Sequence, residues 1–382
     1  MAGIYLHIPF CKKACHYCNF HFSTSLRQKN DFTGALLKEM VLQQNYLRGE
    51  AINTIYLGGG TPSLLEQEEL EMILGRLRGL FTIHPDAEYT LEANPDDITP
   101  AKLAAWRQAG INRLSIGIQS FFEEDLQWMN RAHNAQQAET CIRLAQEAGF
   151  HNLTIDLIYG TPGLTDARWH ENVQKALALH VPHLSCYALT VEPGTALQKM
   201  IEQHKKEAVE EEKQARHFTG LMQWMQEAGY EHYEISNFAK PGFRSRHNTA
   251  YWQGTPYLGL GPSAHSFNGG ARQWNIANNA LYIQSLQNGT VPFEAEVLNA
   301  AQRLNEYIMI SLRTAEGIDL NRLEKEFGPE ALNAVQASLQ PYLQNNRCVI
   351  KEQRVMLTKE GKLFADGIAA DLFVSDEKPI RL

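Results

Sequence analysis

The chain has 382 residues, of which 44% are hydrophobic and 20% charged, and its formal net charge is −8. This is the composition of a globular protein that can bury one large core and a smaller one. The acidic balance argues against a dedicated nucleic-acid-binding protein. No stretch is long and apolar enough to cross a bilayer, and residues 1–9 indicate a strand and not a secretion signal, so we expect a cytoplasmic protein.

Short apolar runs alternate with amphipathic stretches along the first half of the chain. The predicted strands are Ile4–Ile8, Thr54–Leu57, Tyr89–Glu92, Arg113–Ile118, Leu153–Ile158 and Leu184–Leu189. The predicted helices between them include Asp31–Leu47, Gln67–Leu80 and Asp166–His180. Gly110, Gly149 and Gly229 each end a helical pattern just before a strand, as a left-handed C-terminal cap does. Such successive units build a parallel sheet.

Three cysteines, Cys11, Cys15 and Cys18, follow the first predicted strand in the segment HIPFCKKACHYCNF. Three thiols are one too many for a disulfide and one too few for a closed four-ligand metal site. A zinc site completed by His16 or His7 is one alternative, and a redox disulfide is another. The other three cysteines are scattered, which fits a reducing compartment.

The polar residues lie where the predicted strands end. The segment GGGTP, Gly58 to Pro62, follows the second strand, Glu92 closes the third, Gln119 closes the fourth, and Asp156 lies toward the end of the fifth. An active site at these ends is typical of a partial or full (β/α) barrel, so the predicted fold class is α/β. A doubly wound sheet is the alternative, although Ser63 leaves the dinucleotide fingerprint incomplete.

The pattern changes beyond Thr195. Residues 199–216 favour a solvated helix, and residues 236–297 form an aromatic and glycine-rich extension of the predicted barrel core at residues 1–235. Residues 298–382 have the element order of a smaller α+β, winged-helix-like domain. From residue 299 onward the chain holds 11 Lys and Arg against 12 Asp and Glu, so we expect no nucleic-acid binding by this domain.

The spacing C-x3-C-x2-C, with Tyr17 before the last cysteine, resembles the cluster motif of the radical S-adenosylmethionine (SAM) superfamily. The resemblance implies that Cys11, Cys15 and Cys18 bind a [4Fe–4S] cluster whose fourth iron takes SAM as its ligand. It also implies a SAM site made by Tyr5, by the glycine motif with Thr61, and by polar residues at the strand ends. The residues implied in this SAM site are Tyr5, Gly58, Gly59, Gly60, Thr61, Glu92, Gln119, Arg131 and Asp156.

Nearly the whole chain resembles the anaerobic coproporphyrinogen III oxidase branch of that superfamily, and most closely its heme-chaperone members. The oxidases carry a further cysteine where this chain has Phe20, and they have a longer arm before the cluster. The segment HNTAYW, His247 to Trp252, is similar to an H-N-x-x-Y-W motif associated with the chaperones and with heme. The resemblance implies His247 as an axial heme ligand, with Arg244 and Arg246 near the propionates.

Packing of an aromatic core is the alternative explanation of HNTAYW, and His265 and Cys186 are weaker candidates for a heme ligand. Two functions stay open. One is a heme chaperone that delivers heme to an apo-hemoprotein such as a respiratory cytochrome, and the other is a radical SAM enzyme that acts on a tetrapyrrole. The resemblance also allows for a homodimer and for peripheral membrane association. The sequence does not identify the heme acceptor or decide whether SAM is cleaved.

Overall fold

A computed structural model describes residues 1–374 of the chain. These residues form two compact units, one of residues 1–217 and 255–296 and the other of residues 218–254 and from 297 onward. The predicted extension at residues 236–297 is therefore divided between the units. The physical reason is strand pairing, because the strand Tyr257–Leu260 adds to the sheet of the first unit.

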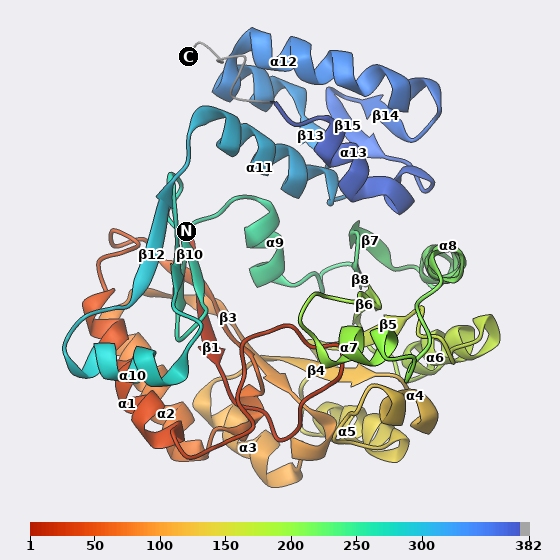
Figure 1. Cartoon of the computed structure of the whole chain (residues 1–382). Helices are drawn as coiled ribbons and strands as arrows, with labels where there is room; N and C mark the ends of the chain where they lie inside the picture. Colours follow the sequence, from red (N-terminus) through yellow and green to blue (C-terminus); the bar gives the residue numbers. More distant parts are fainter. Residues whose placement is uncertain (375–382) are drawn as a thin grey trace. The chain divides into compact units, whose positions relative to one another are not determined.

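The first unit is built on a parallel sheet of six consecutive strands (Figure 1). Each strand pairs in parallel with the next one along the chain. The order does not reverse, so the sheet lacks the switch point of a doubly wound fold and is that of a partial barrel. The strands are β1 (Ala2–Ile8), β2 (Ile52–Gly59), β3 (Ile83–Ala93), β4 (Arg113–Gln119), β5 (Leu153–Tyr159) and β6 (His183–Ala188).

Helices follow these strands, and most of them lie along one side of the sheet (Figure 1). They are α1 (Lys29–Leu42), α2 (Gln67–Leu80), α3 (Pro100–Ala109), α4 (Glu123–Trp128), α5 (Ala135–Glu147), α6 (Asp166–Ala178) and α7 (Ala196–Glu202). Capping boxes begin α2 at Glu66 and α5 at Asn134. The predicted glycine caps are confirmed, since the φ angles of Gly110, Gly149 and Gly229 are 99°, 84° and 73°.

Four further strands extend the sheet beyond β1. Strand β9 (Tyr257–Leu260) pairs with β1 in parallel, and β10 (His265–Phe267), β11 (Ala271–Asn275) and β12 (Phe293–Val297) follow, with α10 (Asn279–Gln287) between the last two. The buried carboxylate of Glu39 joins α1 to this extension. It accepts hydrogen bonds from the Tyr282 hydroxyl at 2.5 Å and from the Gly261 backbone N–H at 2.8 Å.

The single helix predicted over residues 199–216 is wrong. Helix α7 ends at Glu202 and α8 (Glu211–Glu227) begins nine residues later. The φ angle of His204 is 56°, and the backbone N–H of Lys205 turns back to the carbonyl of Met200 at 2.8 Å. This left-handed termination ends the helix.

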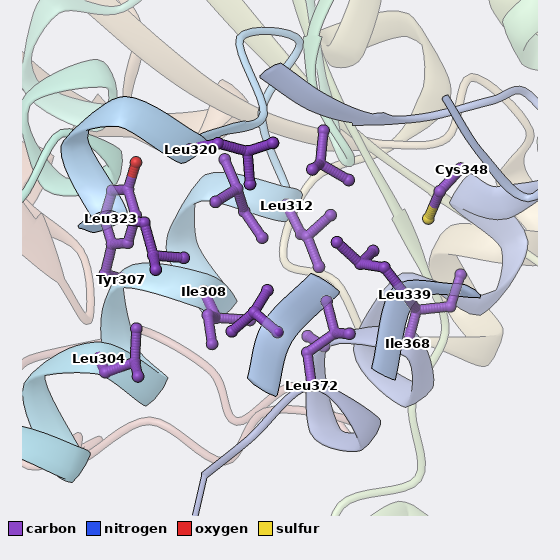
Figure 2. Packing of buried hydrophobic residues seen from close by; sticks show 14 of the residues in the cluster. Leu304, Tyr307, Ile308, Leu312, Leu320, Leu323, Leu339, Cys348, Ile368 and Leu372 are labelled. Atoms are coloured by element: carbon purple, nitrogen blue, oxygen red, sulfur yellow. The ribbon is translucent and has the colours of Figure 1, made fainter. Parts of the chain in front are cut away.

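The second unit has its own hydrophobic core (Figure 2). Its elements are β7 (Glu231–Glu234), β8 (Asn237–Ala239), α9 (Arg246–Trp252), α11 (Ala300–Leu312), β13 (Ile318–Asp319), α12 (Leu320–Gln344), β14 (Cys348–Lys351), β15 (Arg354–Leu357) and α13 (Ala365–Asp371). Leu304, Ile308, Leu312, Leu339, Ile368 and Leu372 point toward one another in Figure 2.

The sequence of the C-terminal domain predicts two short strands, Cys348–Lys351 and Val355–Leu357, and the structure adds a third. Strand β13 pairs with β15, which pairs with β14, so three short strands form the small sheet. Helix α12 is two helices joined at Gly328, whose φ of 85° is not helical. No helix within residues 1–374 is long and apolar enough to span a membrane.

Candidate cluster and cofactor cavity

The three predicted cluster cysteines lie in one loop, residues 9–28, between β1 and α1. All three thiols are free and partly exposed, and they line a single cavity of about 450 Å³. That volume is in the range of small-molecule sites. In residues 1–374, no three His, Cys, Asp or Glu side chains converge as the ligands of a single ion must. Each thiolate of a [4Fe–4S] cluster instead binds its own iron.

Two neighbouring side chains donate hydrogen bonds to the thiols. The Thr61 hydroxyl is 3.4 Å from the Cys11 sulfur, and Arg131 Nη1 is 3.3 Å from the Cys15 sulfur. Burial raises the pKa of Cys11 and raises the pKa of Cys18 to about 11. Because only thiolates bind iron, loading of the site must release protons from these groups.

The glycine motif brings the end of β2 against the end of β1. A Cβ on Gly59, whose φ is 106°, would lie 2.6 Å from Nδ1 of His7. A Cβ on Gly60 would lie 2.7 Å from the backbone oxygen of Phe10, at the start of the cysteine loop. The Gly60 N–H donates to the Ile8 carbonyl at 2.9 Å. Glycine is therefore required here for close backbone approach.

Two buried carboxyl groups, Glu92 on β3 and Asp156 on β5, line the cavity. Glu92 accepts hydrogen bonds from the Tyr56 hydroxyl at 2.8 Å and the Gly59 N–H at 3.1 Å. Burial raises the pKa of Glu92 to about 7 and that of Asp156 to about 6. Burial has removed water from both carboxyl groups. A polar ligand that donates hydrogen bonds to them would therefore stabilise their charged forms.

Gln119 and Arg131 lie on the same cavity. Gln119 ends β4 with a φ of 66°, a conformation that costs energy for a residue other than glycine and is found at functional sites. Arg131 Nη2 donates to the Asn94 side-chain oxygen at 2.8 Å and to the Gly117 carbonyl at 2.7 Å. The Nε atom of Arg131 is buried without a hydrogen-bond partner.

Seven of the nine residues implied for SAM line the cavity, and Tyr5 and Gly58 do not. They lie behind Glu92, because a Cβ on Gly58 would be 3.0 Å from both Glu92 Oε1 and the Tyr5 ring. Asn94 and Gly117 also line the cavity and were not predicted from the sequence. The signal was present, since both lie in the strand-end segments that contain Glu92 and Gln119. A Cβ at Gly117 would lie 3.0 Å from Arg131 Nη2, so this glycine makes room for the guanidinium.

The donor set fits a [4Fe–4S] cluster and SAM. The fit rests on the thiols that share the cavity, on the close glycine approach, and on the buried Arg131 Nε that lacks a partner. An unpaired buried donor is costly, and an acceptor atom on a ligand would satisfy it. The cavity thus combines thiol, carboxyl and guanidinium groups that suit the iron atoms and polar ends of these two cofactors.

The motif HNTAYW forms α9 in the second unit, where His247 is buried. Its Nε2 is 2.8 Å from the Tyr251 hydroxyl, and the two rings meet edge to face. Arg244 is paired with Glu231 at 2.8 Å and with Glu316 at 2.7 Å. The structure therefore brings His247 and Arg244 into internal contacts that heme binding would have to replace.

The other two candidate heme ligands are placed differently. His265 is on β10 with its ring beside that of Trp274 at 6.2 Å between centroids, and it is exposed. Cys186 is 1% exposed, and burial raises its pKa. A buried protonated thiol is a poor iron ligand.

Comparisons with known proteins define the class first. Residues 5–176 match the family model of the radical SAM superfamily, and residues 298–364 match that of the HemN C-terminal domain. The solved structure of coproporphyrinogen III oxidase (HemN) from Escherichia coli, described as a radical SAM enzyme, shares this fold. Its TM-score is 0.85 at 24% identity, over 98% of this chain and 90% of that chain.

Similarity to curated relatives identifies the family within this superfamily. The chain is 31% identical to the heme chaperone HemW of Bacillus subtilis, over 96% of this chain and 98% of that protein. It is 34% identical to a heme chaperone HemW of Mycobacterium tuberculosis, over 97% and 94%. A zebrafish (Danio rerio) mitochondrial radical S-adenosyl methionine domain-containing protein 1 is 32% identical over 98% and 88%. The chain belongs to the HemW family.

Proposed function

We propose that the protein is a heme chaperone that binds heme and passes it to an apo-hemoprotein such as a respiratory cytochrome. The observation that carries this proposal is the near full-length similarity to chaperones named HemW. Phe20 supports this proposal, because the coproporphyrinogen III oxidases that the chain resembles carry a further cysteine at this position. Phe20 is 66% exposed and lines the cavity.

The cluster cavity supports a resident cofactor. Cys11, Cys15 and Cys18 would hold a [4Fe–4S] cluster, and Glu92, Gln119, Arg131 and Asp156 would orient SAM beside it. When bound and reduced, the cluster can supply an electron to SAM. Thr61 and Arg131 would orient the thiolates through the hydrogen bonds that they already donate.

Heme would bind in the second unit through His247. Neutral imidazole ligates heme iron, and burial of the side chain keeps water from the bond. The Tyr251 hydroxyl competes for the same nitrogen, at 2.8 Å. Binding therefore requires rotation of His247 away from Tyr251 and release of Arg244 from its two glutamate partners.

The test begins with protein reconstituted without oxygen, which should hold about four iron atoms and four sulfides per chain. Heme titration of this protein should give a stoichiometric complex that passes heme to an apo-cytochrome. His247→Ala should change the Soret spectrum and weaken heme retention, while Tyr251→Phe should bind heme more tightly because the competing hydrogen bond is lost.

Several outcomes would overturn the proposal. One is protoporphyrinogen formation from coproporphyrinogen III above the level of a Cys18→Ser control, which would favour the tetrapyrrole enzyme. A protein that binds zinc and no cluster would overturn the part of the proposal that concerns the cluster. A heme spectrum and affinity that are unchanged in both the His247 and Tyr251 variants would make His247 structural.

A further inference from the structure

The cysteine loop has little internal support at its centre. Its ends are held by the Cys11 N–H on the Ser23 carbonyl at 3.0 Å and by the Ser23 N–H on the Pro9 carbonyl at 2.8 Å. Between them, the backbone makes one local bond, from the Cys18 N–H to the Cys15 carbonyl at 3.3 Å. Residues 13–17 must therefore be positioned by another part of the chain.

The Leu197 N–H, in the first turn of α7, donates to the His16 carbonyl at 2.7 Å. Further contacts come from the segment Trp128–Arg131, which ends α4 and which we name the clamp segment. The His16 N–H donates to the Met129 carbonyl at 3.2 Å, and His16 Nδ1 lies 3.1 Å from the Trp128 carbonyl. Asn130 Nδ2 donates to the Ala14 carbonyl at 2.7 Å. Each of the last three contacts joins the clamp segment to the cysteine loop.

The backbone of the clamp segment is itself fixed. The φ angle of Asn130 is 61°, a left-handed conformation that Asn adopts more readily than most residues. The Arg131 N–H donates to the Leu126 carbonyl at 2.9 Å, which closes the end of α4. Met129 is fully buried in a cluster with Leu126 and neighbouring apolar residues. Because the backbone is already fixed, the hydrogen bond from the Asn130 amide to the loop costs no further backbone entropy.

Arg131 joins the same loop to the strand ends. Of its five N–H groups, the pair on Nη1 faces the Cys15 sulfur at 3.3 Å and the Tyr17 hydroxyl at 3.5 Å. The pair on Nη2 faces Asn94 and Gly117. Only the Nε–H of Arg131 has no partner in the protein, so with these contacts in place the guanidinium does not offer two parallel N–H groups to a carboxylate.

We propose that Asn130 and Arg131 are positioning residues for the cluster loop: Asn130 holds its backbone, and Arg131 orients Cys15 and donates a hydrogen bond to its sulfur. This deepens the proposed function, since it rests on the cluster site. It gives Arg131 a role on the thiol side of the cavity in addition to the SAM contact that the resemblance implies. A hydrogen bond and a positive charge at a cluster sulfur stabilise the more negative, reduced state.

Asn130→Gly tests the backbone role, because glycine keeps the left-handed φ and removes only the amide. The matched control is Asn346→Gly in the second unit, where an exposed Asn has a φ of 58°. In the metal-free protein, hydrogen exchange of the His16 amide, which donates to the clamp segment, should rise about fivefold in Asn130→Gly, as loss of one net hydrogen bond predicts. After reconstitution, the cluster should be lost to a chelator faster in this variant than in Asn346→Gly.

Arg131→Gln tests the sulfur contact, with Arg131→Lys as the variant that keeps the charge. Without SAM, the cluster of Arg131→Gln should have a more negative reduction potential than the wild type, and that of Arg131→Lys should lie between them. Unchanged exchange and chelator rates in Asn130→Gly, or an unchanged potential in Arg131→Gln, would refute the corresponding role. If the wild type assembles no cluster, the cluster site of the proposed function fails, and the exchange measurement still decides the role of Asn130.

Discussion

Glu92 is a single residue whose burial has a measurable consequence for stability. Its pKa is raised from 4.5 to about 7, chiefly by burial. The folded protein therefore retains a proton that the unfolded chain has lost. This contribution to stability is full below pH 4.5 and is lost as the pH rises to about 7, a change of about 3 kcal/mol.

In Glu92→Gln the side chain is neutral at every pH. We expect urea unfolding of the metal-free protein to show that the variant gains stability relative to the wild type between pH 5 and pH 8. Glu124→Gln is the control, because hydrogen bonds from its own backbone and from Arg168 lower the pKa of Glu124. Its contribution changes only at pH values below about 4.5, so its difference from the wild type should stay constant between pH 5 and pH 8. A difference between Glu92→Gln and the wild type that does not change with pH would contradict this explanation.

Most of the residues that the sequence predicts for the site do face the cavity, but the sequence could not predict their partners. The cysteine spacing and the strand-end positions of Glu92 and Asp156 place these residues at one end of the sheet. The contacts of Arg131 come from the cysteine loop, β4 and the turn after β3, which are far apart in the chain. Only tertiary folding brings such segments together.

At the scale of elements, Gly60 of the glycine motif approaches the backbone of the cysteine loop so closely that we expect it to tolerate no side chain. Gly60→Ala should destabilise the protein by about 1–3 kcal/mol, because its Cβ would meet the Phe10 and Ile8 carbonyl oxygens at 2.7 and 2.8 Å. Gly75→Ala is the matched variant, since Gly75 is inside α2 and no other part of the protein lies within 4 Å of where its Cβ would be. It should stabilise the protein by about 0.5–1 kcal/mol.

Denaturant unfolding of both variants measures these changes. A Gly60→Ala protein as stable as the wild type would show that the cysteine loop can move away from β2 at little cost. In that case the glycine would be required by the ligand and not by the fold.

Elements with local signals were predictable, and elements that depend on pairing were not. The parallel strands and the Gly110 and Gly149 caps carry their signals in neighbouring residues. Strand β13 has two residues and exists because it pairs with β15. The break between α7 and α8 follows from the left-handed His204, a residue type that does not by itself mark a helix end.

At the scale of the whole molecule, the two predicted ligand sites lie in different units. The cysteines belong to the first unit, and His247 belongs to the second, whose core is built from α11, α12, α13 and the small sheet (Figure 2). A unit with its own core can keep its fold when a site in another unit is lost. Heme binding through His247 should therefore not require the cluster.

Cys18→Ser separates the two sites, because it removes a cluster ligand and leaves every residue of the second unit unchanged. We expect the variant to lose its iron and sulfide while its heme affinity and Soret spectrum stay within about twofold of the wild type, a difference of about 0.4 kcal/mol. Heme titration followed by visible absorbance measures both properties on one sample. A His247→Ala variant gives the reverse result, with an intact cluster and altered heme binding. Loss of heme binding in Cys18→Ser would contradict this prediction. It would mean either that heme binds at the barrel cavity or that heme binding requires the cluster in the first unit.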